Sequence, residues 1–376
     1  MPYSKEDLDR RLQLSRELLS PYTPRQLTSG LENLTLSGPG RQLDIAFPAA
    51  LAPKTKQGVV GNPEDALPKV DVAVLTYTAD ESKALADVLT PGRFAPDWAH
   101  YTRGFASYLP QIRNGAPARM EGRLGSYWQT AVGGKDVLVL KSELHMNQDF
   151  HLVNGKPTLP ILNFFKQVLT EAQPKYFFCI GTAGGLYPDK PLGTVAASRA
   201  VRFMCEKDFK NEPFANQEFQ SDWTVPTGNS ATALALMKPF LPNLAVPASS
   251  GVATCPCKEL QGTSQPTANF LLDGHAGIPP FHPVLTTDFF EFGTDKNQLD
   301  KLGMAVEMDD AVFGLAASQT AKPPRWASIR NYSDPAINSQ LPMKQQENCA
   351  TEIYLHYGYW TSVLGAIATW SIIAGL

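Results

Sequence analysis

The sequence carries no excess of positive charge. Its 376 residues include 33 Lys and Arg against 36 Asp and Glu, for a formal net charge of -3. A protein that neutralises the phosphates of a nucleic acid needs a basic surface or arm, and no basic block of that kind occurs. We therefore expect no nucleic-acid partner.

Cysteine is scarce and odd in number, with five in the whole chain. Small secreted proteins held by disulfides show a dense and even set, so we expect reduced thiols here. Cys255 and Cys257 form a CxC pair, but no second Cys or His pair stands at the spacing of a zinc site. We expect no metal site at this pair.

The two ends of the sequence differ: the first residues carry no export signal, whereas the last leave a membrane span open beside a packed helix. The first residues, MPYSKEDLDRRLQLSRELL, are charged throughout and lack the apolar core of an export signal, so we expect a cytoplasmic protein. Segment 353–376 has no Asp, Glu, Lys or Arg and is about long enough to span a bilayer. Its many small and aromatic residues, together with Glu352 and His356, favour a helix packed against a sheet instead.

Short apolar runs alternate with helical patterns from residue 69 onward, which predicts a three-layer α/β sandwich. We divide the chain into an extension, 1–68, with a helix at 4–20 and an irregular remainder, and a catalytic domain, 69–376, with a Pro-rich and Gly-rich insertion at about 206–280. The expected strands lie at 70–75, 124–130, 136–140, 175–180, 194–197, 284–287, 305–308 and 326–331. The expected helices lie at 80–89, 159–172, 310–318 and the C-terminus, with glycine turns at 133–134 and 181–185.

Polar residues follow several of these strands, where open α/β sheets bind their ligands. They are Asp80 and Glu81, the GTAGG segment at 181–185, EMD at 307–309 and RNYSD at 330–334. Glycines allow a close approach of backbone to a ring or sugar, but this segment has neither the Lys of a phosphate loop nor the GxGxxG spacing. The acidic residues at these strand ends suit the cleavage of a nucleoside, which needs one carboxyl group to accept hydrogen bonds from the ribosyl hydroxyls and another to protonate the leaving base.

Four segments resemble motifs of the nucleoside phosphorylase and nucleosidase superfamily, in the family's order. They are GTAGGL at 181–186, PLGTV at 191–195, AVEMDDA at 305–311 and IRNYSDPA at 329–336. The family typically shows G[ST]AGGL, G-D-[IV], V-E-M-E-A and R-x-x-S-D. Over residues 69–376 the resemblance implies a mixed central sheet flanked by helices, a small-molecule nucleoside or nucleotide partner, no metal or organic cofactor, and a homo-oligomer.

The resemblance also implies roles for individual residues. Asp334, with Ser333 beside it, matches the acid that protonates the purine at N7, and Glu81 matches the Glu with which nucleosidases activate water. Asp309 stands where the family has a Glu that holds the ribose hydroxyls, and this shorter side chain implies a shifted sugar or a water-bridged contact. The remaining positions implied to contact the substrate are Thr182, Ala183, Gly184, Glu307, Met308, Arg330, His145 and one of Phe289 and Phe290, which would stack on the base.

The departures from the family favour hydrolysis over phosphorolysis. Glu143 stands where phosphorylases carry an Arg that binds phosphate, and TYTADES at 76–82 lacks their glycine-rich phosphate turn. The function we expect is hydrolysis of the N-glycosidic bond of a purine nucleoside, with adenine suggested by the nucleosidase resemblance. Two alternatives stay open: a phosphorylase whose phosphate ligands come from elsewhere, such as Arg199 or Arg202, and a binding or storage protein without catalysis. The extension at 1–68 would wrap a neighbour or cover the pocket.

Overall fold

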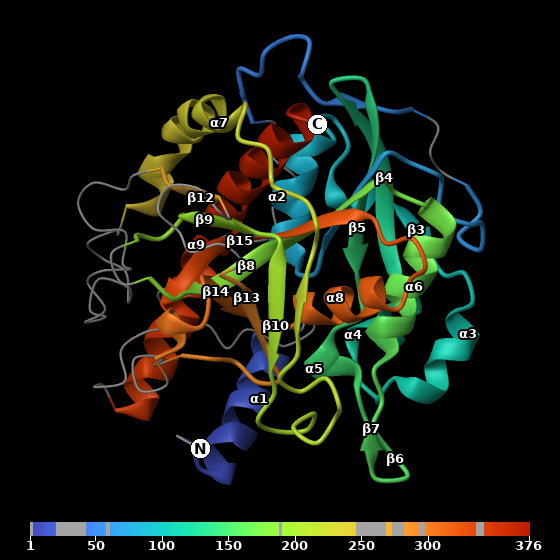
Figure 1. The fold of residues 1–376 in the computed structure, drawn as a ribbon, viewed down its shortest axis with the longest axis vertical. Helices are drawn as coiled ribbons and strands as arrows, with labels where there is room; N and C mark the ends of the chain where they lie inside the picture. Colours follow the sequence, from blue (N-terminus) through green and yellow to red (C-terminus); the bar gives the residue numbers. More distant parts are fainter. Residues whose placement is uncertain are drawn as a thin grey trace.

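One mixed β-sheet with helices on both faces forms the body of the protein (Figure 1). The computed structural model describes residues 3–19, 43–57, 61–187, 190–245, 268–272, 282–292, 298–335 and 342–376. The CxC pair, Cys255 and Cys257, and much of the insertion lie outside these residues. Within them, the fold is the α/β sandwich that the sequence predicts.

The sheet is mixed, with both parallel and antiparallel neighbours along its central path β1-β4-β5-β2-β8-β14-β13-β10-β11. Strand β2 is parallel to β5 and β8, whereas β14 is antiparallel to β8. Strand β15 pairs with β8 in parallel and with β9 antiparallel, and β12 extends β9. The strands of this sheet are β1 (Lys54–Thr55), β2 (Val72–Thr76), β3 (Ala99–Tyr101), β4 (Gly125–Val132), β5 (Lys135–Ser142), β8 (Tyr176–Gly185), β9 (Val195–Ser198), β10 (Ala200–Met204), β11 (Glu218–Gln220), β12 (Phe270–Leu272), β13 (Val284–Thr287), β14 (Ala305–Glu307) and β15 (Arg325–Pro335). A separate hairpin joins β6 (Leu152–Val153) to β7 (Lys156–Pro157).

Successive residues of β2 point into two different cores, because side chains alternate across a strand. Ala73 and Leu75 belong to the core beneath α6 and α8, while Val72 and Val74 belong to the core beneath α2 and α9. All five residues of this strand are buried, as expected of a strand covered on both faces. The helices are α1 (Lys5–Leu19), α2 (Ala79–Leu89), α3 (Phe105–Tyr108), α4 (Pro117–Glu121), α5 (Met146–Asp149), α6 (Pro160–Ala172), α7 (Ser230–Met237), α8 (Asp310–Ser318) and α9 (Met343–Ala374), with 3-10 turns η1 (Ala95–Asp97), η2 (Leu109–Gln111), η3 (Lys238–Leu244) and η7 (Leu299–Lys301).

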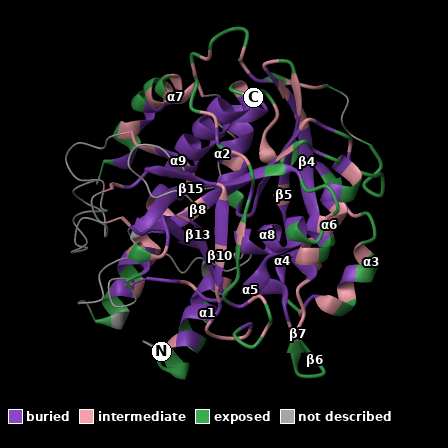
Figure 2. Ribbon diagram, viewed as in Figure 1, coloured by how far each residue is buried: buried purple, intermediate pink, exposed green. Residues whose placement is uncertain are grey.

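The uncharged C-terminal segment forms most of α9, which packs against β15 and α2 and is largely buried (Figure 2). A Cβ at Gly365 would lie 2.7 Å from Asn331 Oδ1, so the small residue is what lets helix and strand approach. Among the described residues no helix is long and apolar enough to cross a membrane. The packed-helix interpretation of this segment is therefore confirmed.

The glycine turn expected at 181–185 is wrong, because these residues continue β8 as a strand up to Gly185. They pair in parallel with β15 and, at Gly184 and Gly185, antiparallel with β14. A Cβ on Gly185 would lie 2.6 Å from Cδ2 of Tyr332, so glycine serves close packing between strands here rather than a turn. Strand β15 is also longer than expected, and β10 to β12 and α7 were not anticipated.

Candidate active site

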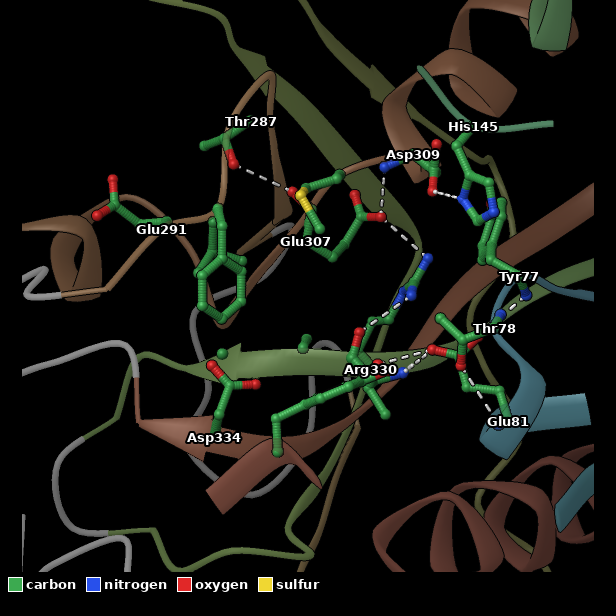
Figure 3. A pocket seen from close by; sticks show the side chains of 17 residues that line it. Tyr77, Thr78, Glu81, His145, Thr287, Glu291, Glu307, Asp309, Arg330 and Asp334 are labelled. Carbon is green, nitrogen blue, oxygen red and sulfur yellow. Dashed lines mark hydrogen bonds and ion pairs between the residues drawn. The ribbon is translucent and has the colours of Figure 1, made fainter. Parts of the chain in front are cut away.

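A pocket, with about 520 Å³ of empty space including the adjoining solvent, opens where β2, β8, β13 and β14 end and β15 passes (Figure 3). Its position agrees with the expectation that polar residues at strand ends meet at one edge of the sheet. The residues that line it are Tyr77, Thr78, Glu81, His145, Thr182, Ala183, Gly184, Thr287, Phe290, Glu291, Val306, Glu307, Met308, Asp309, Arg330, Asp334 and Tyr354. All the site residues expected from the sequence are in this set except Phe289 and Ser333.

Asp334 is the carboxyl group best arranged to give up a proton. Ser333 Oγ donates to its Oδ1 at 2.8 Å, whereas its buried Oδ2 has no hydrogen-bond partner among the described residues. Burial raises the pKa of Asp334 to about 7, opposed by the hydrogen bond from Ser333. The pairing of β15 with β8 shifts register between Tyr332 and Asp334, so Ser333 is the extra residue of a bulge.

Glu81 lies at the N-terminus of α2 and bridges the ends of β2 and β8. Its Oε2 accepts hydrogen bonds from Thr76 Oγ1 at 2.9 Å and from the backbone nitrogens of Tyr77 and Thr78 at 3.0 and 2.8 Å. Its Oε1 accepts from the backbone nitrogen and Oγ1 of Thr182 at 2.8 and 2.7 Å. Burial opposes ionisation, but the charge of Arg330 and these hydrogen bonds outweigh it and lower the pKa of Glu81. Glu81 is therefore an ionised and rigidly held carboxylate.

Arg330 is buried at the centre of the pocket between carboxylates. Its Nη2 donates to Glu307 Oε2 at 3.0 Å, its Nε to Asp310 Oδ2 at 2.8 Å, and its Nη1 to the carbonyl oxygen of Thr182 at 3.1 Å. Burial and the nearby Asp310 raise the pKa of Glu307 to about 8, although Arg330 acts in the opposite direction. The guanidinium is thus neutralised by protein groups before any ligand arrives.

Asp309 uses both carboxylate oxygens within the protein. Its Oδ2 lies 3.2 Å from His145 Nδ1, and its Oδ1 accepts from the backbone nitrogen of Met146 at 2.7 Å. Burial lowers the pKa of His145, but the hydrogen bond and charge of Asp309 outweigh this and the net shift is upward. Asp309 and His145 are therefore bound to each other in the pocket wall, which also includes Met308.

The structure distinguishes the two phenylalanines. Phe290 lines the pocket, whereas Phe289 is 1% exposed and packs edge-on against Tyr3, with 5.9 Å between ring centroids. Ser333 lies behind Asp334 rather than in the pocket wall. Six lining residues were not anticipated: Tyr77, Thr78, Thr287, Glu291, Val306 and Tyr354. The strand-end pattern contains a signal for the first three, since they directly follow β2 or end β13, but none for Tyr354 on α9.

The pocket wall does not include the three side chains considered above in relation to phosphate binding, which are Glu143, Arg199 and Arg202. Glu143 is buried, with Arg123 Nη2 2.9 Å from its Oε1 and Lys141 bound to its other oxygen. Arg199 donates to Thr224 Oγ1 at 3.2 Å, and neither it nor Arg202 lines the pocket. Glu143 therefore contributes no charge to the pocket wall, because Arg123 and Lys141 pair with it.

No protein-family model matches the sequence, and no protein with a curated description matches it. Among solved structures, the chain is similar to futalosine hydrolase of Helicobacter pylori, at 11% identity and a TM-score of 0.44 over 81% of this chain and 97% of that one. It is also similar to 5'-methylthioadenosine/S-adenosylhomocysteine nucleosidase of Neisseria meningitidis, at 13% identity and a TM-score of 0.43 over 81% and 99%. S-adenosylhomocysteine nucleosidase of Streptococcus pyogenes matches at 13% identity and a TM-score of 0.46 over 83% and 99%. These structures belong to the superfamily that the sequence motifs resemble, but at such low identities and TM-scores the inference of function rests on the pocket itself.

Proposed function

We propose that the protein hydrolyses the N-glycosidic bond of a purine nucleoside, with Asp334 as the acid that protonates the departing base. The observation that carries this proposal is the state of Asp334 in the pocket. One of its oxygens is held by Ser333, the other has no partner in the described part of the chain, and its pKa is raised to about 7. A general acid works best when its pKa lies near the pH of the reaction.

The other pocket residues fit the remaining steps. The base would lie between Phe290 and Asp334, with the sugar against Met308 and His145. As the bond from the anomeric carbon to the base breaks, its electron pair leaves with the base, and Asp334 Oδ2 delivers its proton to the ring nitrogen. Positive charge then builds on the ribosyl group, and the ionised carboxylate of Glu81 stabilises it.

Glu81 would take the proton of the water that adds to the anomeric carbon. Its lowered pKa makes it a weak base for free water, but water that binds an oxocarbenium ion becomes strongly acidic, so a weak base suffices at that stage. Access to Oε1 requires the Thr182 hydroxyl, which now donates to that oxygen, to rotate away. The products are the free base and the free sugar.

The charge of the pocket supports water rather than phosphate as the nucleophile. Five carboxyl side chains line it, whereas Arg330 is the only Lys or Arg among its described lining residues. That arginine is already bound by Glu307 and Asp310. Glu81 is ionised, so a phosphate dianion would lose its hydration next to a like charge without a free cation to replace it, which is strongly unfavourable. Adenine as the base rests on the resemblance of the motifs to nucleosidases.

The test is release of free base from adenosine, inosine, methylthioadenosine and AMP, followed by chromatography with and without phosphate. The variants are Asp334→Asn and, as a control, Asp87→Asn, since Asp87 is also buried but lies outside the pocket and binds Tyr359. Release without phosphate that is lost only in Asp334→Asn supports the proposal. Release that requires phosphate identifies a phosphorylase, and nucleoside binding without release identifies a binding protein; either result refutes hydrolysis.

A further inference from the structure

The N-terminal helix lies against the segment that carries the pocket's phenylalanine. Tyr3 and Leu8 form a cluster with Phe289, and Leu14 of α1 packs with Phe292. Segment 288–292 follows β13 and supplies Phe290 and Glu291 to the pocket wall. The first helix of the extension therefore backs one wall of the site.

Arg11 is the centre of this contact and is 1% exposed. Its Nη1 donates to the carbonyl oxygens of Phe292 at 2.8 Å and Phe290 at 3.4 Å, and to Glu291 Oε1 at 3.1 Å. Its own carbonyl oxygen accepts from the backbone nitrogen of Phe290 at 3.4 Å. The guanidinium lies over the rings of Tyr3 and Phe292, 3.9 and 3.7 Å from their centroids. One side chain thus holds three successive residues of the pocket segment.

Glu291 makes this contact sensitive to the loss of Arg11. Its Oε1 accepts from Tyr3 Oη at 2.6 Å as well as from Arg11, and the side chain is almost fully buried. Burial raises its pKa to about 7, whereas the charge of Arg11 lowers it. Removing one partner of a buried ion pair leaves the other charge uncompensated, so the segment should rearrange rather than keep its place.

Position 11 differs from its neighbours on α1 in a way that stability alone does not require. Leu8, Leu12 and Leu14 already provide apolar docking for the helix. Arg10, one residue away, has a side chain 48% exposed and pairs with Glu347 of α9. A buried arginine that binds carbonyl oxygens fixes the orientation of a segment, which aliphatic packing does not do.

We propose that Arg11 is a positioning residue of the active site, which holds segment 290–292 from α1 and thereby sets the ring of Phe290 against the base. This inference rests on the proposed function, in which Phe290 faces the base. The first helix of the extension then supports a wall of the pocket of its own chain, and substrate capture depends on the docking of α1.

The experiment compares Arg11→Met, Arg11→Lys, Tyr3→Phe and the control Arg10→Met in the full chain. We expect Arg11→Met to raise KM for the nucleoside about tenfold with a smaller change in kcat, since the chemical groups at Asp334 and Glu81 remain in place. Tyr3→Phe should raise KM less, and Arg10→Met should match the wild type. Hydrogen exchange in 288–292 should quicken in Arg11→Met but not in Arg10→Met.

An Arg11→Met protein that keeps the wild-type KM and the wild-type exchange in 288–292 overturns the inference. If that variant does not fold, the Arg11→Lys and Tyr3→Phe variants decide in the same way. If the wild type releases no base from any nucleoside, the proposed function fails, and the role of Arg11 against the base fails with it. Exchange then still shows whether Arg11 holds the segment, so the two failures are distinguishable.

Discussion

Ser333 controls the proton on Asp334, which makes Ser333→Ala an informative change. The Ser333 hydroxyl donates to Asp334 Oδ1 at 2.8 Å and acts against burial, which raises the pKa of this acid to about 7. A hydrogen bond to a charged group is worth about 1.5–3 kcal/mol, and about 1.4 kcal/mol corresponds to one pKa unit. Because part of the bond also stabilises the neutral acid, we expect the pKa in Ser333→Ala to rise by about one unit.

The assay is kcat/KM for base release from about pH 5 to about pH 9, because this ratio reports the pKa values of the free enzyme. The reaction needs Asp334 protonated, so the wild type should be active below about pH 7 and lose activity about tenfold per pH unit above it. In Ser333→Ala this alkaline limb should begin about one unit higher. Asp334→Asn should lose the limb altogether and fall by about 10²–10⁴ in rate.

Three results would refute this reasoning. An alkaline limb that stays in place in Ser333→Ala would show that the hydroxyl does not govern the titrating group. A limb that moves to lower pH in Ser333→Ala would show that the hydrogen bond raises, rather than lowers, the pKa of Asp334. An Asp334→Asn enzyme that keeps the limb would assign the titration to another residue.

The two phenylalanines should separate binding from stability. Phe290→Ala should raise KM about fivefold, because it removes a ring contact of about 1 kcal/mol. Phe289→Ala should leave KM closer to the wild type and lower the free energy of unfolding in urea. Arg330→Met should destabilise the protein by about 3–5 kcal/mol, since it leaves the carboxylates of Glu307 and Asp310 buried without their cation; an unchanged urea midpoint would contradict this. Burial raises the pKa of Asp149 from 3.8 to about 7. Between about pH 4 and about pH 7 the unfolded chain has therefore lost this proton while the folded protein keeps it, so the free energy of unfolding should fall by about 4 kcal/mol as the pH rises over this range. Asp149→Asn should flatten that fall in thermal unfolding, and identical pH dependence in variant and wild type would exclude it.

The strand-end pattern in the sequence located most of the site. Short apolar runs predicted β2 and β13, and the polar residues after β2, β8 and β14 meet in one pocket. For β2 and β8 this works because neighbouring parallel strands end at the same edge of the sheet. Strand β14 is antiparallel to β8, but it is only three residues long and pairs with Gly184 and Gly185 at the end of β8, so its polar residues lie at the same place.

Contacts between distant segments were beyond such reasoning. Tyr354 lines the pocket from α9, and Arg11 of α1 binds the lining residue Glu291 from behind. Glu143 and Asp309 illustrate the same limit, since the first pairs with Arg123 and the second with His145. Which cation neutralises a carboxylate depends on three-dimensional packing, and no local spacing encodes it.

The two sides of the pocket are held by parts of the molecule that differ in the free energy needed to open them locally. Asp334 belongs to β15, which is paired along its length with β8 and also with β9, whereas Phe290 depends on a segment held by a terminal helix. Local opening of a helix docked outside the sheet generally requires less free energy than opening of a strand paired on both sides. Mild heating should therefore impair the capture of dilute nucleoside before it impairs turnover at saturation, and bound substrate should protect the enzyme against this early loss.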